Sequence, residues 1–314
     1  MNLNKLKKLS GDASFRHFYR SRNSIIVYCV KNKKSNLLDY DAVNKILIKK
    51  EVLAPFLISQ NYKKNYIEIQ DFGDLTVFKK FKNKSINKKI YYKEIIDLLI
   101  KLKNIKIKKQ TTFLNTKYRI PSYTPKMLLD ESNLFIDWYL PKYFKGKTHQ
   151  SLKKKLKIIF KNLLKNISLT EKVFVHRDFH ISNIMITKNG LALIDSQDAV
   201  FGNAAYDLAS LIDDVRLRTN IQTKNFIYDE YIKKNKNLDH KNFKNDFEIL
   251  SVLRNFKIIG IFTRLSVRDK KNKYLKLIPY AWELIYSRSA KSPIFKDLNY
   301  ILTKYFDKKK RKLI

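Results

Sequence analysis

The chain has 314 residues, of which 44% are hydrophobic, and its 66 Lys and Arg outweigh 28 Asp and Glu to give a formal net charge of +38. This length and apolar content are enough for a large buried core, which excludes a disordered tail. Lys exceeds Arg along the whole length and not in one patch, so we expect no specific nucleic-acid partner, because readers of nucleic acid concentrate Arg on one face.

The sequence also bears on compartment and membrane. Cys29 is the only cysteine, so no internal disulfide is expected and the fold needs no oxidising environment. No segment approaches the roughly 18 apolar residues that a membrane span requires, and the first residues, MNLNKLKKLS, lack the apolar core of a signal peptide. We therefore expect a cytoplasmic protein without a membrane span.

The first 75 residues are predicted to form a small sheet with one helix packed on it. Residues 9 to 30 alternate as two short strands around a turn, and the segment FLISQNYKKNYIEIQ reads as strand, turn and strand. Between them, apolar side chains at helical spacing predict a helix over 39 to 50, which Pro55 closes. Gly73 marks an extended exit from the sheet.

After residue 75, amphipathic helical patterns dominate, interrupted only by one hairpin near 183 to 195. The predicted helices cover 86 to 104, 125 to 138, 149 to 167, 204 to 216, 243 to 265 and 273 to 289. The change of character predicts an α+β bilobal fold of the protein-kinase type, with a small β-rich N-lobe over 1–75 and a large helical C-lobe over 76–314.

The segment from His176 to Asp207 carries most of the chemical information. An apolar strand over 173 to 175 leads into HRDFHISN, and two alternating strands follow around Asn189-Gly190, a dipeptide typical of tight hairpins. Pairing Thr187 with Leu191 in that hairpin predicts that Asn183 lies opposite Asp195.

This arrangement predicts phosphoryl transfer. Mg²⁺ prefers a few protein oxygens and completes its shell with phosphate and water oxygens, so Asn183 and Asp195 are the expected metal ligands. H-R-D followed by four residues and Asn, and then by a hairpin and Asp, is the catalytic-loop pattern of kinases, in which Asp178 would be the base. The alternative is that these are unrelated polar residues in surface loops. The spacing, the hairpin and the following helix all disfavour it.

These residues show a family resemblance. HRDFHISN followed by LALIDSQDAVFGNAAYDLASL resembles the aminoglycoside phosphotransferase and choline kinase-like superfamily. GDASFRHFYR, QDFGD, LFIDWYLP, LRNFKIIGIFTRL and YLKLIPYAWELI are similar to stretches of the anomeric N-acetylmuramate/N-acetylglucosamine kinases of cell-wall recycling. The resemblance spans nearly the whole chain and implies ATP and Mg²⁺ as cofactors and a small molecule, most simply an amino sugar, as substrate.

The resemblance also implies supporting roles around the loop. His176, Arg177 and His180 are expected to support the catalytic loop, His180 through hydrogen bonds and not proton transfer. Asp207, in the first turn of the next helix, resembles the carboxylate that accepts backbone amides of the loop, although a charge favouring the helix dipole is the alternative.

On the nucleotide side, we expect Gly11 and Ser14, in a turn between apolar stretches, to lie over the ATP phosphates. Asp71 is expected to bind nucleotide from the extended segment near 70 to 75, the predicted hinge between the two lobes. One expected residue is missing. Kinases carry a Lys on the third strand that pairs with a helix Glu, whereas IIVYCV has no Lys and the helix at 39 to 50 has no Glu. Phosphate anchoring therefore stays unassigned at this point.

The candidates for acceptor binding are Gln197, Asp198, Arg254 and Asn255. Arg254 lies among apolar helical positions, where an Arg either pairs with an internal carboxylate or faces a ligand. A basic lobe favours an anionic or neutral amino sugar over cationic aminoglycosides or choline.

The predicted function is ATP- and Mg²⁺-dependent transfer of the γ-phosphate to the anomeric hydroxyl of N-acetylmuramate or N-acetylglucosamine. The alternatives are a kinase of the same fold for choline, another sugar or an aminoglycoside, and a non-catalytic basic pseudokinase. A zinc hydrolase is disfavoured, because HEXXH is absent and there is one Cys. The oligomeric state does not follow from the sequence.

Overall fold

The computed structural model describes residues 6–9, 16–83, 85–290, 292–307 and 309–311. Its contacts divide the chain into two compact units, 1–122 with 172–201, and 123–171 with 202–314. The catalytic-loop segment thus belongs to the same unit as the N-terminal sheet. This division differs from the predicted lobe boundary at residue 75, which stays a prediction.

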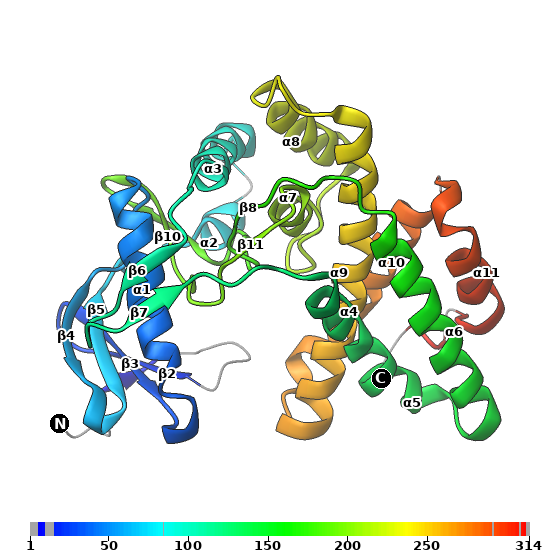
Figure 1. Cartoon of the computed structure of the whole chain (residues 1–314), viewed down its shortest axis with the longest axis horizontal. Coiled ribbons are helices and arrows are strands. Elements are labelled where there is room, and N and C mark those ends of the chain that lie inside the picture. Colours follow the sequence, from blue (N-terminus) through cyan, green and yellow to red (C-terminus); the bar gives the residue numbers. More distant parts are fainter. Residues whose placement is uncertain (1–5, 10–15, 84, 291, 308, 312–314) are drawn as a thin grey trace. The chain divides into compact units, whose positions relative to one another are not determined.

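The first unit is built on a five-stranded antiparallel sheet with the order β1-β2-β3-β5-β4 (Figure 1). Its strands are β1 (Lys7–Lys8), β2 (Arg16–Arg20), β3 (Ser24–Cys29), β4 (Leu57–Asn61) and β5 (Tyr66–Gln70). Helix α1 (Asn36–Lys49) packs on the sheet, and its Leu37 and Tyr40 join Val27, Ile67 and other strand residues in one apolar core. The predicted strands and helix of this region are confirmed.

Further elements complete the first unit. They are the helices α2 (Val77–Phe81) and α3 (Lys88–Lys103) and the strands β6 (Lys109–Thr111), β7 (Lys117–Arg119), β8 (Val173–Val175), β9 (Ile184–Thr187), β10 (Gly190–Leu193) and β11 (Val200–Gly202). The expectation of a single hairpin after residue 75 is wrong, because β6 and β7 form a second hairpin and β8 pairs with β11. These strands are only three residues long, too short to show a clear alternation in sequence.

Backbone hydrogen bonds fasten the β9–β10 hairpin within the first unit. The amide of Ile186 donates to the carbonyl of Leu75 at 2.8 Å, and that of Leu193 donates to Leu53 at 2.8 Å. In the loop before β9, the carbonyl of Ile181 accepts from Phe78 at 3.0 Å. The chain from 172 to 201 is thereby tied to segments that precede residue 80.

The second unit is helical and is organised around the 30-residue helix α9 (His240–Asp269) (Figure 1). The other helices are α4 (Pro125–Leu134), a π-helical turn η4 (Phe135–Tyr139), α5 (Leu140–Tyr143), α6 (Gly146–Lys165), α7 (Ala205–Ile212), α8 (Ile221–Lys233), α10 (Ile278–Ser289) and α11 (Lys296–Tyr305). Helix α9 packs against α4, η4, α7 and α10. Together with the sheet of the first unit, this confirms the predicted α+β kinase-like fold.

An aromatic cluster joins three segments of the second unit. Phe135 in η4 lies 4.8 Å from Phe256 in α9 and 5.6 Å from Trp282 in α10, measured between ring centroids. All three side chains are at most 1% exposed. These segments contain three of the stretches that carried the family resemblance, LFIDWYLP, LRNFKIIGIF and YAWELI, so the similarity coincides with the core of this unit.

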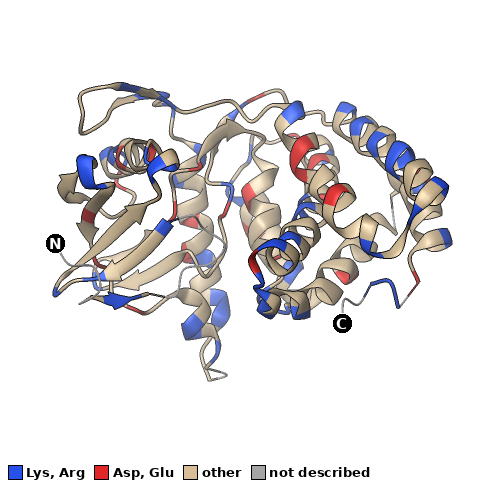
Figure 2. Ribbon diagram, turned by 90° about the horizontal axis from the view of Figure 1, so that it is seen from below, with Lys and Arg blue, Asp and Glu red and all other residues tan. Residues whose placement is uncertain are grey.

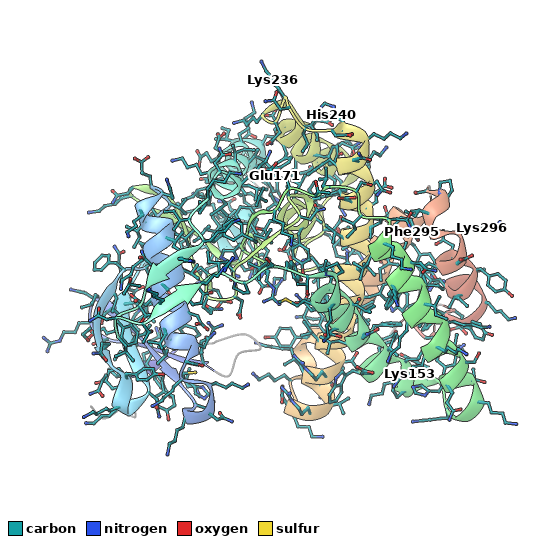
Figure 3. The ribbon with its side chains drawn as sticks, viewed as in Figure 1. Lys153, Glu171, Lys236, His240, Phe295 and Lys296 are labelled. Atoms are coloured by element: carbon teal, nitrogen blue, oxygen red, sulfur yellow. The ribbon has the colours of Figure 1, made fainter. Side chains whose placement is uncertain are left out.

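Basic residues occur on elements of both units (Figure 2). On α6 the apolar side chains of Leu152, Leu156 and Phe160 are buried, whereas Lys154 and Lys155 are exposed and Lys153, labelled in Figure 3, is partly exposed. Among the described residues, no helix is long and apolar enough to cross a membrane.

Candidate active site

The loop predicted to be catalytic, residues 176 to 183, begins where β8 ends. Val173 to Val175 are all buried, and the next residue, His176, is completely buried. Arg177 follows with φ of 72°, in the left-handed region that side-chain-bearing residues rarely adopt. This turn of the backbone brings Asp178 out of the strand direction into a partly exposed position.

Two hydrogen bonds fix the backbone of Asp178. Its carbonyl accepts from the amide of His180 at 3.0 Å and from the side-chain Nδ2 of Asn183 at 3.0 Å. The amide of Asn183 in turn donates to the carbonyl of His180 at 2.8 Å. Because Nδ2 of Asn183 is committed to Asp178, the orientation of its Oδ1 is set as well.

The hairpin after the loop has a register that differs by one residue from the prediction. Thr187 pairs with Gly190 and Ile184 with Leu193, and Ile194 donates its amide to Asn183 at 3.1 Å. Asn183 therefore lies opposite Ile194 and not Asp195. The reason is that Gly190 has φ of 112° and follows the two loop residues, as in a turn closed by a glycine bulge, whereas the prediction placed it inside the turn.

Asp195 nevertheless lies at this edge, because the chain turns sharply there. Its φ is 65°, again left-handed, and its Oδ1 accepts from Arg16 at 3.0 Å and from Nε2 of Gln197 at 3.2 Å. The same Nε2 of Gln197 donates to Oδ2 of Asp198 at 2.8 Å. Gln197, which is 3% exposed, thus bridges two carboxylates.

The cluster contains three carboxylates, of Asp178, Asp195 and Asp198, whose negative charges interact. Burial raises the pKa of Asp195 above its usual range, Asp178 and Asp198 raise it further, and Arg16 opposes the shift. Burial lowers the pKa of His176, although the negative charges of Asp178 and Asp195 oppose it. Such a concentration of negative charge is stabilised by bound cations. Asp195 and Asn183 provide the hard oxygen donors that suit Mg²⁺.

Helix α1 supports the cluster through uncharged groups. The Oγ of Ser196 donates to Oδ1 of Asn44 at 2.5 Å, and Nδ2 of Asn44 donates to the carbonyl of Pro55 at 2.7 Å, all within the interior. The phenol of Tyr40 is close enough to Asp195 for that charge to affect its pKa, which burial raises strongly. The sequence interpretation missed Arg16, Tyr40 and Asn44.

A signal for Arg16 is present in the sequence. In RHFYR, Arg16 and Phe18 share one face of the strand because side chains alternate with period two, and Phe18 packs against the sheet core. An Arg on the core-facing side of a strand is a residue that requires a buried partner.

The predicted nucleotide-side residues are only partly described. Gly11 and Ser14 lie outside the described residues. Asp71 is held by Arg20, whose Nε lies 2.6 Å from Oδ2, and its Oδ1 accepts the amide of Gly73 at 2.7 Å. Asp71 therefore fixes the hinge segment to β2, and its role toward nucleotide stays a prediction.

Three predicted residues belong to the second unit. Asp207 lies in the first turn of α7 and is 2% exposed. Arg254 and Asn255 lie side by side on α9, 5% and 0% exposed, and Nδ2 of Asn255 donates to the carbonyl of Ser251 in its own helix at 2.9 Å. Arg254 makes no ion pair with any described acidic residue. The roles of all three stay predictions.

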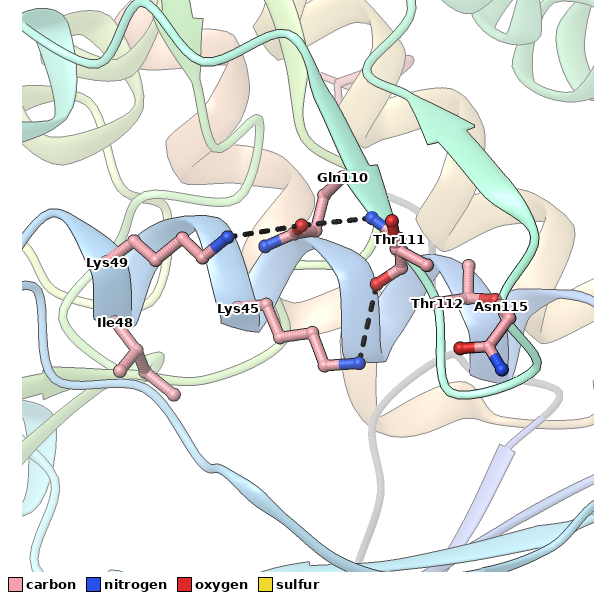
Figure 4. Close-up of a pocket in the computed structure, with 7 residues that line it drawn as sticks. All are labelled: Lys45, Ile48, Lys49, Gln110, Thr111, Thr112 and Asn115. Carbon is pink, nitrogen blue, oxygen red and sulfur yellow. Dashed lines mark hydrogen bonds between the residues drawn. The ribbon is translucent and has the colours of Figure 1, made fainter.

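A cavity of about 550 Å³ in the first unit lies between α1 and the β6–β7 hairpin and shares no residue with the catalytic cluster (Figure 4). Its polar groups are engaged with one another. The Nζ of Lys45 donates to the carbonyl of Thr111 at 3.4 Å, and Lys49 donates to Oε1 of Gln110 at 3.4 Å. The residues lining it include no carboxylate, so it offers none of the chemistry found at the catalytic loop.

Solved structures share this fold. A choline/ethanolamine kinase family protein from Mesorhizobium loti matches 93% of this chain and 90% of its own, with a TM-score of 0.62 and 12% identity. An ADP-bound aminoglycoside phosphotransferase matches 91% of this chain and 93% of its own, with a TM-score of 0.61 and 14% identity.

Relatives with similar sequence carry kinase names. The N-acetylmuramate/N-acetylglucosamine kinase of Pseudomonas putida is 24% identical over 307 residues, which cover 95% of this chain and 87% of the relative. The enzyme of that name from Neisseria meningitidis is 27% identical over 286 residues, covering 86% of this chain and 81% of the relative. The model of the phosphotransferase enzyme family matches residues 5–227. The chain therefore belongs to the phosphotransferase enzyme family, and the prediction of a small-molecule kinase is confirmed.

Proposed function

We propose that the protein transfers the γ-phosphate of ATP, with Mg²⁺, to the anomeric hydroxyl of N-acetylmuramate or N-acetylglucosamine, as a cytoplasmic step of peptidoglycan recycling. The observation that carries the phosphotransfer chemistry is the arrangement of Asp178, Asn183 and Asp195 around one loop and hairpin. The relatives named above, which span most of both chains, support the choice of sugar.

Asp178 is the proposed base. Its backbone carbonyl accepts two hydrogen bonds, which fix the part of the loop from which the carboxylate extends. A carboxylate that accepts the hydroxyl proton as the phosphoryl group is transferred is the role of this Asp in kinases. An anomeric hydroxyl is more acidic than an ordinary alcohol, and a weak base such as Asp178 suits it.

Asn183 and Asp195 are the proposed metal ligands. The hydrogen bonds described above use Nδ2 of Asn183 and Oδ1 of Asp195, so the proposed donors to the metal are Oδ1 of Asn183 and Oδ2 of Asp195. Mg²⁺ at these oxygens would neutralise charge on the phosphates during transfer. Gln197 orients Asp195 and Asp198, which makes it a positioning residue of this site.

Arg254 is the proposed contact for an anionic substituent of the sugar. Arg254 is 5% exposed, and its Nη1 is buried without a hydrogen-bond partner among the described residues, although a buried cation needs a compensating negative charge. N-acetylmuramate carries a carboxylate that would supply this charge, whereas N-acetylglucosamine does not. Arg254 is therefore expected to favour the former sugar.

The reaction is tested with purified wild type and Asp178→Asn. ADP release is measured with Mg-ATP and N-acetylmuramate, N-acetylglucosamine, glucosamine, choline or kanamycin. Turnover with an N-acetyl sugar that falls by roughly 10²–10⁴-fold in Asp178→Asn supports the proposal. Turnover only with another acceptor would retain the kinase and reject the amino sugar, and ATP binding without any turnover would indicate a pseudokinase.

The position of the phosphate needs its own control. A phosphate on the anomeric oxygen removes the reducing end of the sugar, whereas a phosphate on any other hydroxyl leaves it intact. A reducing-sugar assay of the product separates the two. N-acetylglucosaminitol, which lacks the anomeric hydroxyl, should not be phosphorylated, and its phosphorylation would contradict the proposed site of transfer.

Arg254→Gln separates the two sugars. KM for N-acetylmuramate should rise by about tenfold or more, because a charge-assisted hydrogen bond is lost, while KM for N-acetylglucosamine changes by less than about threefold. Arg268→Gln, at an exposed position of the same helix, is the matched control. Equal effects on both sugars would reject a carboxylate contact.

A further inference from the structure

The phosphate-binding cation expected in a kinase is absent from its usual strand. In kinases a Lys on the third strand contacts the α- and β-phosphates and pairs with a helix Glu. Here β3 reads SIIVYC and α1 reads NLLDYDAVNKILIK, so neither residue is present. Since nucleotide phosphates carry several negative charges, another cation is required close to Asp195.

Arg16 lies in the position where such a cation is needed. It is the first residue of β2 and pairs across the sheet with Cys29, the last residue of β3. Its side chain is 5% exposed, and its Nη2 lies 3.0 Å from Oδ1 of Asp195 and 4.0 Å from Oδ2 of Asp198. The guanidinium therefore reaches the metal-binding edge from a strand adjacent to the one that usually carries the Lys.

The chemistry of the guanidinium permits two contacts at once. An Arg has five N–H donors in a fixed planar fork, which suits carboxylates and phosphates. It can hold Asp195 with one edge and a phosphate oxygen with another. A Lys ammonium on β3 would meet the same need with a point charge.

The composition of helix α1 is consistent with Arg16 in place of the strand Lys. A helix Glu would neutralise the cation in the absence of nucleotide, but α1 carries no Glu and places the phenol of Tyr40 near Asp195 and the carboxyl of Asp39 near Asp198. Tyr40 is close enough to Asp195 and Arg16 for both charges to act on it. The guanidinium of Arg16 contacts the carboxylates of Asp195 and Asp198, and neither residue belongs to α1.

We propose that Arg16 replaces the missing strand Lys, positioning Asp195 through their ion pair and binding the α- and β-phosphates of the nucleotide. This inference rests on the proposed function in so far as it takes ATP to be the phosphoryl donor. It does not depend on the identity of the acceptor.

The test compares nucleotide binding with nucleoside binding. Dissociation constants of ATP, with and without Mg²⁺, and of adenosine are measured by calorimetry for the wild type, Arg16→Ala, Arg16→Gln and Arg16→Lys. Arg22→Ala is the matched control, because Arg22 is an exposed Arg in the turn between β2 and β3. Circular dichroism and thermal unfolding establish that each variant is folded.

Arg16→Ala is expected to weaken ATP binding by roughly 10- to 100-fold, the range for a hydrogen bond to a charged group, and to leave adenosine binding within about twofold. Arg16→Lys should recover part of the loss, because the charge remains while the planar fork is lost. In turnover assays, Arg16→Lys should raise KM for ATP by a larger factor than it lowers kcat.

An ATP-to-adenosine affinity ratio that stays at the wild-type value in folded Arg16→Ala would overturn the inference, as would equal losses for both ligands. If Arg16→Ala does not fold, the comparison of Arg16→Gln with Arg16→Lys tests the inference. The ATP-to-adenosine affinity ratio must then be higher in Arg16→Lys than in Arg16→Gln, because only Lys keeps the positive charge. ATP binding that depends on Arg16 without turnover of any sugar would reject the proposed acceptor and leave this inference standing.

Discussion

Gly260 lies where α9 crosses the junction of α4 and η4, and a single methyl group there should destabilise the second unit. A Cβ built on Gly260 would lie 2.3 Å from the carbonyl carbon of Leu134, 2.4 Å from the amide nitrogen of Phe135 and 2.5 Å from the carbonyl oxygen of Leu134. All three atoms are backbone, so no side-chain rotation relieves the clash. The helices must separate.

The size of the effect follows from these distances. Ordinary contacts of a Cβ begin at 3.4 Å, so α9 and the α4–η4 segment would have to move apart by about 1 Å. A gap of this size forfeits a quarter to a half of the dispersion energy at the interface, and overpacking typically costs about 1–3 kcal/mol or more. Ala gains about 1 kcal/mol over Gly in a helix, which offsets part of the loss. We expect Gly260→Ala to lower the free energy of unfolding by about 2–4 kcal/mol.

Urea unfolding followed by tryptophan fluorescence measures this change, since Trp282 lies in the aromatic cluster beside η4. Gly146→Ala is the control, because Gly146 has φ of 52° but a Cβ there would touch nothing within 4 Å. The control should cost about 1 kcal/mol from backbone strain alone. A Gly260→Ala variant as stable as the wild type, or more stable, would refute the close approach of the two helices.

Two further sites hold carboxyl groups with shifted pKa values. Asp213 is held by Lys224 at 2.7 Å and Arg288 at 2.8 Å, so Asp213→Asn should lower the free energy of unfolding in urea by about 3–5 kcal/mol. Asp213→Asn combined with Lys224→Met should lower it by less than the sum of the two single losses, and strictly additive losses would contradict the network. Despite burial, the charges of Arg288 and Lys224 lower the pKa of Asp213 to about 2, so its stabilising contribution is present above about pH 4 and is lost as pH falls toward 2. Asp39 behaves in the opposite way, because burial first and the charge of Asp198 second raise its pKa to about 6. The Asp39 carboxyl loses its proton at a lower pH in the unfolded chain than in the folded chain, so the free energy of unfolding falls as pH rises from about 4 to 6. Asp39→Asn should therefore raise the unfolding midpoint at pH 7.5 and leave it nearly unchanged at pH 4. An equal rise at both pH values would contradict the shifted pKa.

Local patterns predicted most elements of the chain. The alternation in β5, the β-branched residues of β3 and the helical spacing in α1 come from side chains that contact the sheet core of the first unit, and the spacing in α9 comes from side chains buried within the second unit. Such patterns are visible in a short window. Helices α8 and α11 were missed, although both bury apolar side chains at helical spacing, Ile227 and Tyr231 in α8 and Leu298, Ile301 and Leu302 in α11. The hairpin at Asn189-Gly190 was predicted correctly but with its register off by one residue, because the dipeptide fits both a two-residue turn and a glycine bulge.

The family and the loop predicted to be catalytic could be inferred from the sequence, because the hydrogen bonds of Asp178 and Asn183 and the pairing of β9 with β10 join residues that are close in sequence. The tertiary structure alone decided which distant groups meet. Arg16 and Asp195 are 179 positions apart, and Gly260 touches the backbone of Leu134 only because two helices cross there. Such contacts depend on how separate elements pack, and no local pattern of propensity or periodicity encodes that packing.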